Sequence, residues 1–125
     1  LKMSEVIVSD LIQWLEGQLQ LSEAIKVDAI AAKSGYSKWY LQREFKQKKG
    51  LSIAEYVRKR RLHEAATLLC ASELPIIDIA LKYGFSSQQT FSRVFRAHFN
   101  TSPAKFRDQR LYPKLDEVME MNKRH

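Results

Sequence analysis

The sequence has few residues that break helices or cross-link a chain. Its 125 residues include three prolines, four glycines and one cysteine, Cys70. A single cysteine excludes an internal disulfide and fits a reducing cytosol. No apolar run approaches the roughly 20 residues that span a bilayer, and the first residues lack the basic and apolar regions of a signal peptide. We therefore expect a cytoplasmic protein without a membrane segment.

The motifs of common enzymes and metal sites are also missing. There is no glycine-rich phosphate loop, and no serine or cysteine nucleophile is visibly paired with a base. His63, His98 and His125 have no ligand spacing with one another or with Cys70, which falls on an apolar helix face and is expected in the core. We expect no enzyme activity, no metal and no cofactor.

Positive charge is concentrated in the middle of the chain, whose formal net charge is +7. Residues 34–71 carry nine basic and three acidic side chains, and residues 72–110 carry six and three, whereas residues 1–33 have a net charge of −2. A basic field favours a polyanion as partner, which can be DNA, RNA or an acidic membrane surface. Charge alone leaves simple solubility open as the alternative.

Apolar residues recur at helical spacing along most of the chain, and strand-type alternation is weak. The pattern predicts an all-α fold of seven helices, of which the fourth is the longest. The expected buried face of the first helix is Ile7, Leu11, Trp14 or Leu15, and Leu19. The expected caps or first residues of the seven helices are Ser4, Val27, Ser37, Ser52 with Glu55, Pro75, Ser86 with Gln89, and Ser102.

An internal repeat is the most informative feature of the chain. Residues 30–58 and 79–108 follow one plan, first at an offset of 49 and, after an inserted residue in the second turn, at an offset of 50. Two copies suit two small subdomains joined by the long fourth helix, since solenoids need about three or more repeats. The predicted organisation is a subdomain at 1–50, a linker helix at 51–72, a subdomain at 73–110 and a tail at 111–125.

Each copy reads as a helix, a glycine turn and a capped helix, which is the helix-turn-helix plan. Gly35 and Gly84 supply the positive φ that a sharp turn demands. The aromatic residues that follow them, Tyr36 and Phe85, are expected to fill the core below each turn. One match to this pattern is weak, but two matches on basic segments indicate DNA binding.

The exposed side of the second helix in each copy carries side chains that suit base reading. Arginine can donate two hydrogen bonds to guanine, and glutamine can pair with adenine. Trp39 can contact a thymine methyl group, although it could instead fold back onto the first helix. Ordinary solvated faces are the alternative for both stripes. The stripes are Trp39, Gln42, Arg43 and Lys46 in the first copy and Gln89, Ser92, Arg93 and Arg96 in the second, where Gln88 precedes them.

Basic residues and helix N-termini around these stripes are expected to contact phosphates, which position a protein without specifying sequence. The basic run at 58–61 could also touch phosphates, but we favour a solvated face with stems packed on the core. The expected phosphate contacts are Ser37, Lys38, Lys46, Lys48, Lys49, Ser86, Arg96 and Lys105.

Two segments resemble a known family. Residues 34–43, SGYSKWYLQR, resemble the first reading helix of the AraC/XylS family, and residues 83–95, YGFSSQQTFSRVF, resemble its second-unit signature. Both segments are similar to the corresponding segments of the small MarA/SoxS/Rob activators of enteric bacteria. The resemblance covers about residues 6–110 and implies two helix-turn-helix units bridged by a long fourth helix.

The resemblance also implies a function. It implies a monomeric activator that places two reading helices in successive major grooves of an asymmetric site and recruits RNA polymerase to stress, efflux and drug-resistance genes. Because no room remains for an effector domain, no small-molecule effector is expected. The reading positions that it implies are Trp39, Gln42 and Arg43 in the first unit and Gln88, Gln89, Thr90, Ser92 and Arg93 in the second.

Some residues depart from the family pattern. Tyr40 stands where a histidine is common, Ser87 replaces an acidic residue, and Lys26 stands where a hydroxyl N-cap is usual. Two other functions stay open, a non-specific nucleoid-binding protein and an adaptor whose basic face docks an acidic protein. The matched stripes favour a sequence-specific regulator acting on the bacterial nucleoid, because packaging needs charge but not paired amides.

Overall fold

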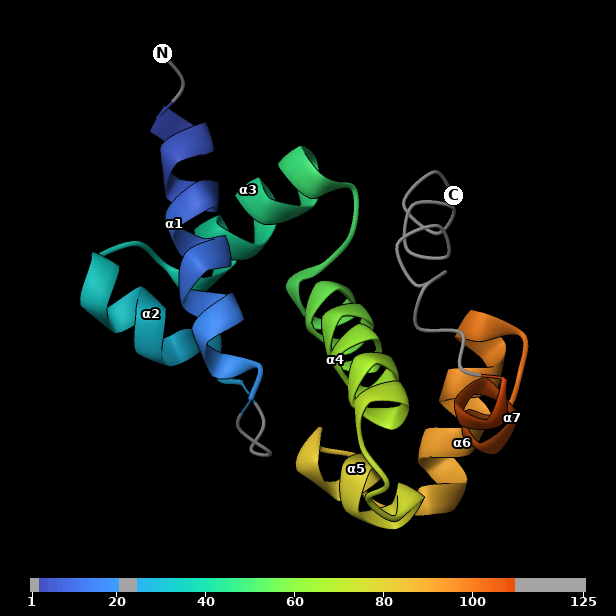
Figure 1. The fold of residues 1–125 in the computed structure, drawn as a ribbon. Helices are drawn as coiled ribbons and strands as arrows, with labels where there is room; N and C mark the ends of the chain where they lie inside the picture. The colour runs from blue at the N-terminus through green and yellow to red at the C-terminus, as the bar shows by residue number, and fades with distance from the viewer. Residues whose placement is uncertain (1–2, 21–24, 110–125) are drawn as a thin grey trace. The chain divides into compact units, whose positions relative to one another are not determined.

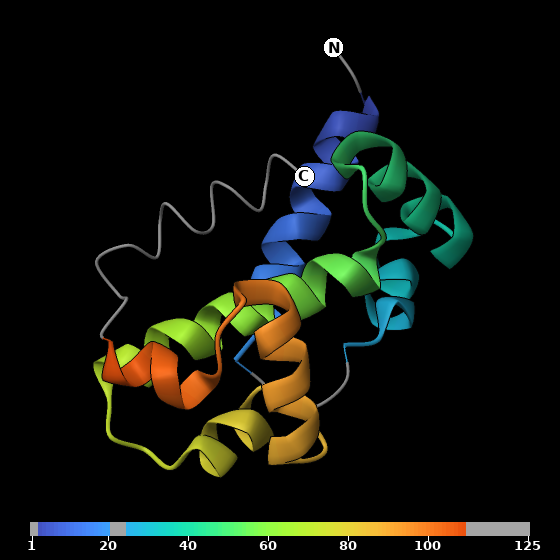
Figure 2. The ribbon, with the colours of Figure 1, turned by 90° about the vertical axis from the view of Figure 1, so that its right-hand side faces the viewer.

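The computed structural model describes residues 3–20 and 25–109, which form seven α-helices and no strand (Figures 1 and 2). The chain divides into two compact units, Leu1–Arg60 and Arg61–His125, and the division falls inside the fourth helix. The predicted all-α fold is confirmed, whereas the predicted tail lies outside the described residues. The helices are α1 (Met3–Gln18), α2 (Val27–Ser34), α3 (Lys38–Lys49), α4 (Ile53–Ala71), α5 (Ile76–Lys82), α6 (Gln88–Phe99) and α7 (Pro103–Asp108).

Serine side chains cap several of these helices where the sequence predicts them. The Oγ of Ser37 accepts a hydrogen bond from the N–H of Tyr40 at 3.0 Å, and Ser102 caps α7 in the same way. Ser52 and Glu55 form the predicted capping box, with bonds of 2.9 and 3.1 Å. The backbone N–H of Ser52, followed by its hydroxyl, holds the pKa of Glu55 below its ordinary value.

Glycine turns separate α2 from α3 and α5 from α6. Gly35 and Gly84 have φ values of 83° and 85°, in the left-handed region that other residues rarely adopt. Phe85 packs against the core of the second unit, as expected. Tyr36 does not, because the residue is 38% exposed and its ring stacks on that of Tyr40 at a centroid distance of 5.3 Å. The prediction that Tyr36 fills the core is therefore wrong.

The core of the first unit holds α3 in place against α1 and α2. On α1, Leu15 is fully buried while Trp14 is only partly buried, so Leu15 is the residue that faces the core at this turn. The buried residues of this core are Ile7, Val8, Leu11, Leu15, Val27, Leu41, Phe45 and Ile53. Ile53 comes from the first turn of α4, so the start of this helix belongs to the first unit.

The core of the second unit is built from aromatic rings and the later turns of α4. Phe91 and Phe95 of α6 are fully buried, and Phe95 meets Phe106 of α7 edge to face at 5.3 Å. Leu62 and Leu69 of α4 complete this core. Partly buried Cys70 packs against the same cluster, as predicted. The rings fix α6 against its neighbours, and its opposite side is left to solvent.

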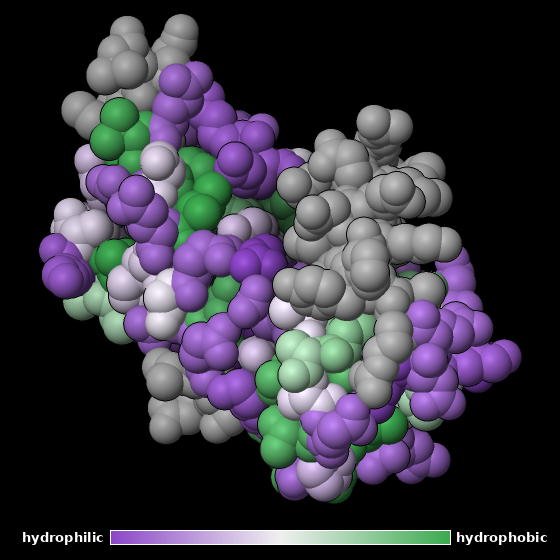
Figure 3. All heavy atoms as spheres, in the orientation of Figure 1, coloured by the Kyte–Doolittle hydropathy of each residue, from purple (hydrophilic) through white to green (hydrophobic). Residues whose placement is uncertain are grey.

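Among the described helices, none combines the length and the apolar character that crossing a membrane requires. Figure 3 shows one face of the molecule, on which hydrophilic residues cover much of the described surface and hydrophobic residues form smaller patches between them. The most exposed large apolar side chain of the described residues is that of Trp39, at 65%.

Candidate DNA-binding interface

In the first unit, α3 presents the predicted reading stripe to solvent. Leu41 and Phe45 anchor the opposite side of the helix in the core. Trp39, Gln42 and Arg43 are exposed, as is Lys46 at the end of the stripe. Tryptophan is enriched among the residues that contribute most to binding at protein interfaces. With this exposure, Trp39 does not fold back into the core beside α1.

Arg43 is held by aromatic and acidic neighbours. Its guanidinium lies 4.8 Å from the ring centroid of Trp39 and 5.9 Å from that of Tyr40. Such cation–π contacts are worth about 0.5–1 kcal/mol at exposed sites. Its Nη2 also donates a hydrogen bond to the buried Glu44 carboxylate at 3.3 Å.

In the second unit, α6 begins one residue later than predicted. The N-cap is Ser87, whose Oγ accepts the N–H of Thr90 at 3.0 Å and whose hydroxyl donates to the Thr90 Oγ1 at 3.1 Å. The predicted capping box of Ser86 with Gln89 is therefore wrong, and the helix N-terminus lies after Ser87. Since Ser37 caps α3, the matching caps are 50 residues apart. The inserted residue of the second copy consequently lies before the cap.

The predicted reading positions of α6 differ in accessibility. Gln88, Gln89 and Arg93 are exposed and share the helix with the buried phenylalanines on its other side. Ser92 is partly buried. Thr90 is also partly buried, and its hydroxyl takes part in the N-cap, which the sequence pattern did not indicate. Among these reading positions, the most accessible hydrogen-bonding groups are therefore two amides and a guanidinium.

The lysines expected to contact phosphate lie at the surface. Lys38 pairs with Asp28 at 3.5 Å and Lys46 pairs with Glu55 at 3.8 Å, and all four side chains are more than half exposed. An exposed ion pair contributes about 0–1 kcal/mol to stability. The two lysines can therefore exchange their carboxylate partners for other anions. Ser37 and Ser86, at the start of the two reading segments, are exposed too. The remaining exposed candidates are Lys48, Lys49, Arg96 and Lys105.

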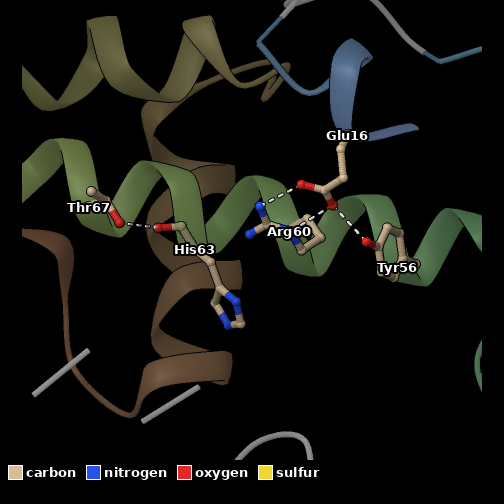
Figure 4. Close-up of polar contacts among 5 residues, drawn as sticks. All are labelled: Glu16, Tyr56, Arg60, His63 and Thr67. Carbon is tan, nitrogen blue, oxygen red and sulfur yellow. Dashed lines mark hydrogen bonds and ion pairs between the residues drawn. The ribbon is translucent and has the colours of Figure 1, made fainter. Parts of the chain in front are cut away.

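The basic run at 58–61 has mixed surroundings rather than one solvated face. Arg58 is exposed, while Arg61 is buried, and this burial lowers its pKa. Arg60 pairs with Glu16 of α1 and is only 24% exposed (Figure 4). Nothing in the sequence spacing of Glu16 and Arg60 predicts this ion pair.

The structure also brings two histidines together. The Nε2 atoms of His63 and His98 lie 3.0 Å apart inside the second unit, although their sequence spacing indicated no relation. His63 is buried and His98 is partly buried. No group of three or more histidine, cysteine, aspartate or glutamate side chains in residues 3–20 and 25–109 is placed to hold a metal ion.

Comparison with protein families and curated sequences gives consistent results. The family model described as a helix-turn-helix domain matches residues 30–109. The probable transcription factor PqrA of Proteus vulgaris is 60% identical over 111 residues, which cover 89% of this chain and 91% of PqrA. The regulatory protein SoxS of Escherichia coli is 46% identical, covering 81% of this chain and 92% of SoxS. The transcriptional regulator Rob of Salmonella typhimurium is 50% identical, but the matched region spans only 34% of its length.

Solved structures show the same fold. An AraC-type regulator from Chromobacterium violaceum has a TM-score of 0.78 at 34% identity, covering 88% of this chain and 96% of that one. The DNA-binding domain of AdpA, solved in complex with a target DNA, has a TM-score of 0.70 at 25% identity, covering 86% and 95%. The chain therefore belongs to the AraC family of helix-turn-helix DNA-binding transcription regulators, in the subgroup of PqrA, SoxS and Rob.

Proposed function

We propose that this chain activates transcription by binding an asymmetric promoter site as a monomer and recruiting RNA polymerase. One observation supports sequence-specific binding of DNA. Two capped helices of 12 residues each, α3 and α6, expose an arginine at matched positions among different neighbours. A protein with two different reading helices should prefer two different half-sites over a palindrome.

The chemistry of each helix suggests what it reads. Arg43 and Arg93 can each donate two hydrogen bonds to guanine O6 and N7, and Gln42, Gln88 and Gln89 can pair with adenine. Trp39 can contact a thymine methyl group, and Ser92 and Thr90 can add a hydroxyl contact at their partly buried positions. The first unit would thus read with an aromatic ring and an amide, and the second with paired amides.

The exposed lysines and helix N-termini would position the protein on the phosphate backbone. We assign this role to Ser37, Lys38, Lys46, Lys49, Arg96 and Lys105. Because α6 starts after Ser87, the amides of its first turn replace Ser86 in this role. Each neutralised phosphate releases counterions, so binding should weaken steeply with salt.

The activating role, recruitment of RNA polymerase and action without a bound effector rest on the family resemblance. The names of PqrA, SoxS and Rob describe regulators of transcription and no enzyme. We propose that the chain likewise has no enzymatic activity and acts at the nucleoid in the bacterial cytoplasm. Transcription in vitro with purified polymerase tests activation, and repression at every bound promoter would contradict it.

Selection of bound sites from random duplex DNA tests specificity most directly. We expect one asymmetric motif, and Arg93→Ala should cost roughly 1–3 kcal/mol at a single guanine position. As a matched control, Lys105→Ala should weaken binding to all sequences about equally and reduce the salt slope by about 1. If Arg93→Ala also weakens all DNA equally, the chain is a non-specific nucleic-acid-binding protein and the proposal is wrong.

A further inference from the structure

Glu44 is a charged residue on the buried side of the reading helix α3. It is 6% exposed and lies between Leu41 and Phe45, which anchor that side in the core. A carboxylate in such a place is costly unless a hydrogen-bonded cation compensates its charge. The cation here is Arg43, whose Nη2 lies 3.3 Å from Glu44 Oε2.

The contact between Arg43 and Glu44 requires a bent conformation of the arginine side chain. Neighbouring residues on a helix point about 100° apart and do not face each other. Arg43 therefore has to bend its guanidinium toward the carboxylate, and in this position it also lies over the Trp39 ring. One ionic contact and the rings of Trp39 and Tyr40 hold the group that is proposed to read guanine.

The second unit lacks this arrangement. At an offset of 50, Glu44 corresponds to Val94 and Trp39 corresponds to Gln89. Arg93 is exposed, and no side-chain hydrogen bond or ion pair links its guanidinium to another of the described residues. The two matched arginines thus differ in how far they are fixed before DNA arrives.

We propose that Glu44 is a positioning residue for Arg43 that raises the sequence selectivity of the first unit. The carboxylate takes one N–H of Nη2 and leaves the other donors for a base edge. A guanidinium that is already fixed loses less conformational freedom on binding. This inference rests on the proposed function of Arg43.

Glu44→Gln tests the proposal, because it keeps the shape of the side chain and removes its charge. The measured quantity is the ratio of the dissociation constant for random duplex to that for the selected site. We expect this ratio to fall about three- to tenfold, the size of one net intramolecular hydrogen bond. Glu55→Gln is the matched control, since it removes a negative charge from the same unit and preserves the capping box. It should shift both constants alike and leave the ratio unchanged.

A double-mutant cycle separates positioning from general stability. In an Arg43→Ala background, Glu44→Gln should no longer change the ratio. An effect that persists there, or an unchanged ratio in the single variant, would overturn the proposal. If Glu44→Gln lowers the melting temperature, Glu44→Leu suits the buried site better and should lower the ratio as well. If Arg43→Ala itself leaves binding to the selected site unchanged, base reading by Arg43 fails, which is a different result from an uncoupled Glu44.

Discussion

Arg60 donates two hydrogen bonds to the carboxylate of Glu16, from Nε at 2.9 Å and from Nη2 at 2.8 Å, across a sequence separation of 44 residues. The hydroxyl of Tyr56 donates a third bond to the same carboxylate at 2.6 Å (Figure 4). The three side chains join the end of α1 to the first turns of α4 within the first unit. Planar, two-point pairing of this kind is specific to arginine.

We predict that Arg60→Ala destabilises the first unit by roughly 1–3 kcal/mol, and that Arg60→Lys recovers only part of the loss. The exposed neighbour Arg58→Ala should stay within about 0.5 kcal/mol of the parent protein. Both tryptophans, Trp14 and Trp39, lie in the first unit, so tryptophan fluorescence during urea unfolding reports on that unit. An equal loss in both alanine variants would show that the pairing with Glu16 contributes nothing specific.

The same cluster predicts how stability depends on pH. The hydrogen bond from Arg60 lowers the pKa of Glu16, so its contribution is present above the ordinary value of 4.5 and is lost as the pH falls through the lowered pKa. Burial, followed by the bond to Glu16, raises the pKa of Tyr56 from 10.0 to about 12. Its contribution is therefore present below pH 10 and is lost between about pH 10 and 12.

Urea midpoints followed by tryptophan fluorescence across this pH range test both limbs. Glu16→Gln should flatten the acid limb, and Tyr56→Phe should flatten the alkaline limb. Lysines also lose protons above pH 10, so only the difference between Tyr56→Phe and the parent protein counts. An alkaline limb that is identical in the two proteins would contradict the assignment to Tyr56.

The N-cap of α6 can be tested at Ser87, with the adjacent Ser86 as the control. Ser87→Ala should cost about 0.5–2 kcal/mol, because it removes the side-chain acceptor of the Thr90 N–H. Ser86→Ala should be nearly neutral, since Ser86 is exposed and lies outside the cap. Thermal unfolding followed by circular dichroism compares the two. A larger loss for Ser86→Ala would restore the capping box expected from the sequence.

The contact of His63 with His98 should couple the two residues energetically. Single and double alanine variants should show an interaction energy of about 0.5–3 kcal/mol, the usual range for side chains in direct contact. His63→Ala should be the more damaging single change, because His63 is 4% exposed and its removal leaves a cavity. Urea unfolding followed by circular dichroism supplies the four free energies. If the losses in the free energy of unfolding are additive, the two rings lie next to each other without an energetic coupling.

Much of the fold could be predicted because local signals fix helix ends. The caps formed by Ser37, Ser52 and Ser102 are hydrogen bonds between residues three positions apart. Such short-range bonds can be recognised from the local sequence. Gly35 marks a turn because only glycine adopts its φ at little cost. The exposed stripes followed from the same helical period that placed the phenylalanines inside.

The start of α6 shows how local signals can mislead. Two serines stand side by side, and Gln89 three residues after Ser86 is the usual sign of a capping box. The aromatic core favours the other register, since Phe91 and Phe95 are fully buried in a helix that starts after Ser87. The local pattern alone therefore did not distinguish the two adjacent serines.

The side-chain pairs that join distant segments could not be predicted. Glu16 with Arg60 and His63 with His98 are 44 and 35 residues apart, and only the packed helices bring them together. Glu44 is adjacent to Arg43 in sequence, but nothing in the helical pattern distinguishes it from the other charged residues of this segment. Its burial depends on how α3 lies against its neighbours.

The two reading helices begin and end in equivalent ways. Each has 12 residues, each follows a serine N-cap, and each leaves through a left-handed residue, Gly50 in one case and Asn100 in the other. The ends are thus independent of the exposed residues between them. For protein engineering, the exposed side chains of one helix can be transferred to the other, provided that the serine caps, Thr90 and buried Glu44 stay in place. A chain carrying two copies of one surface would then prefer two copies of a single half-site.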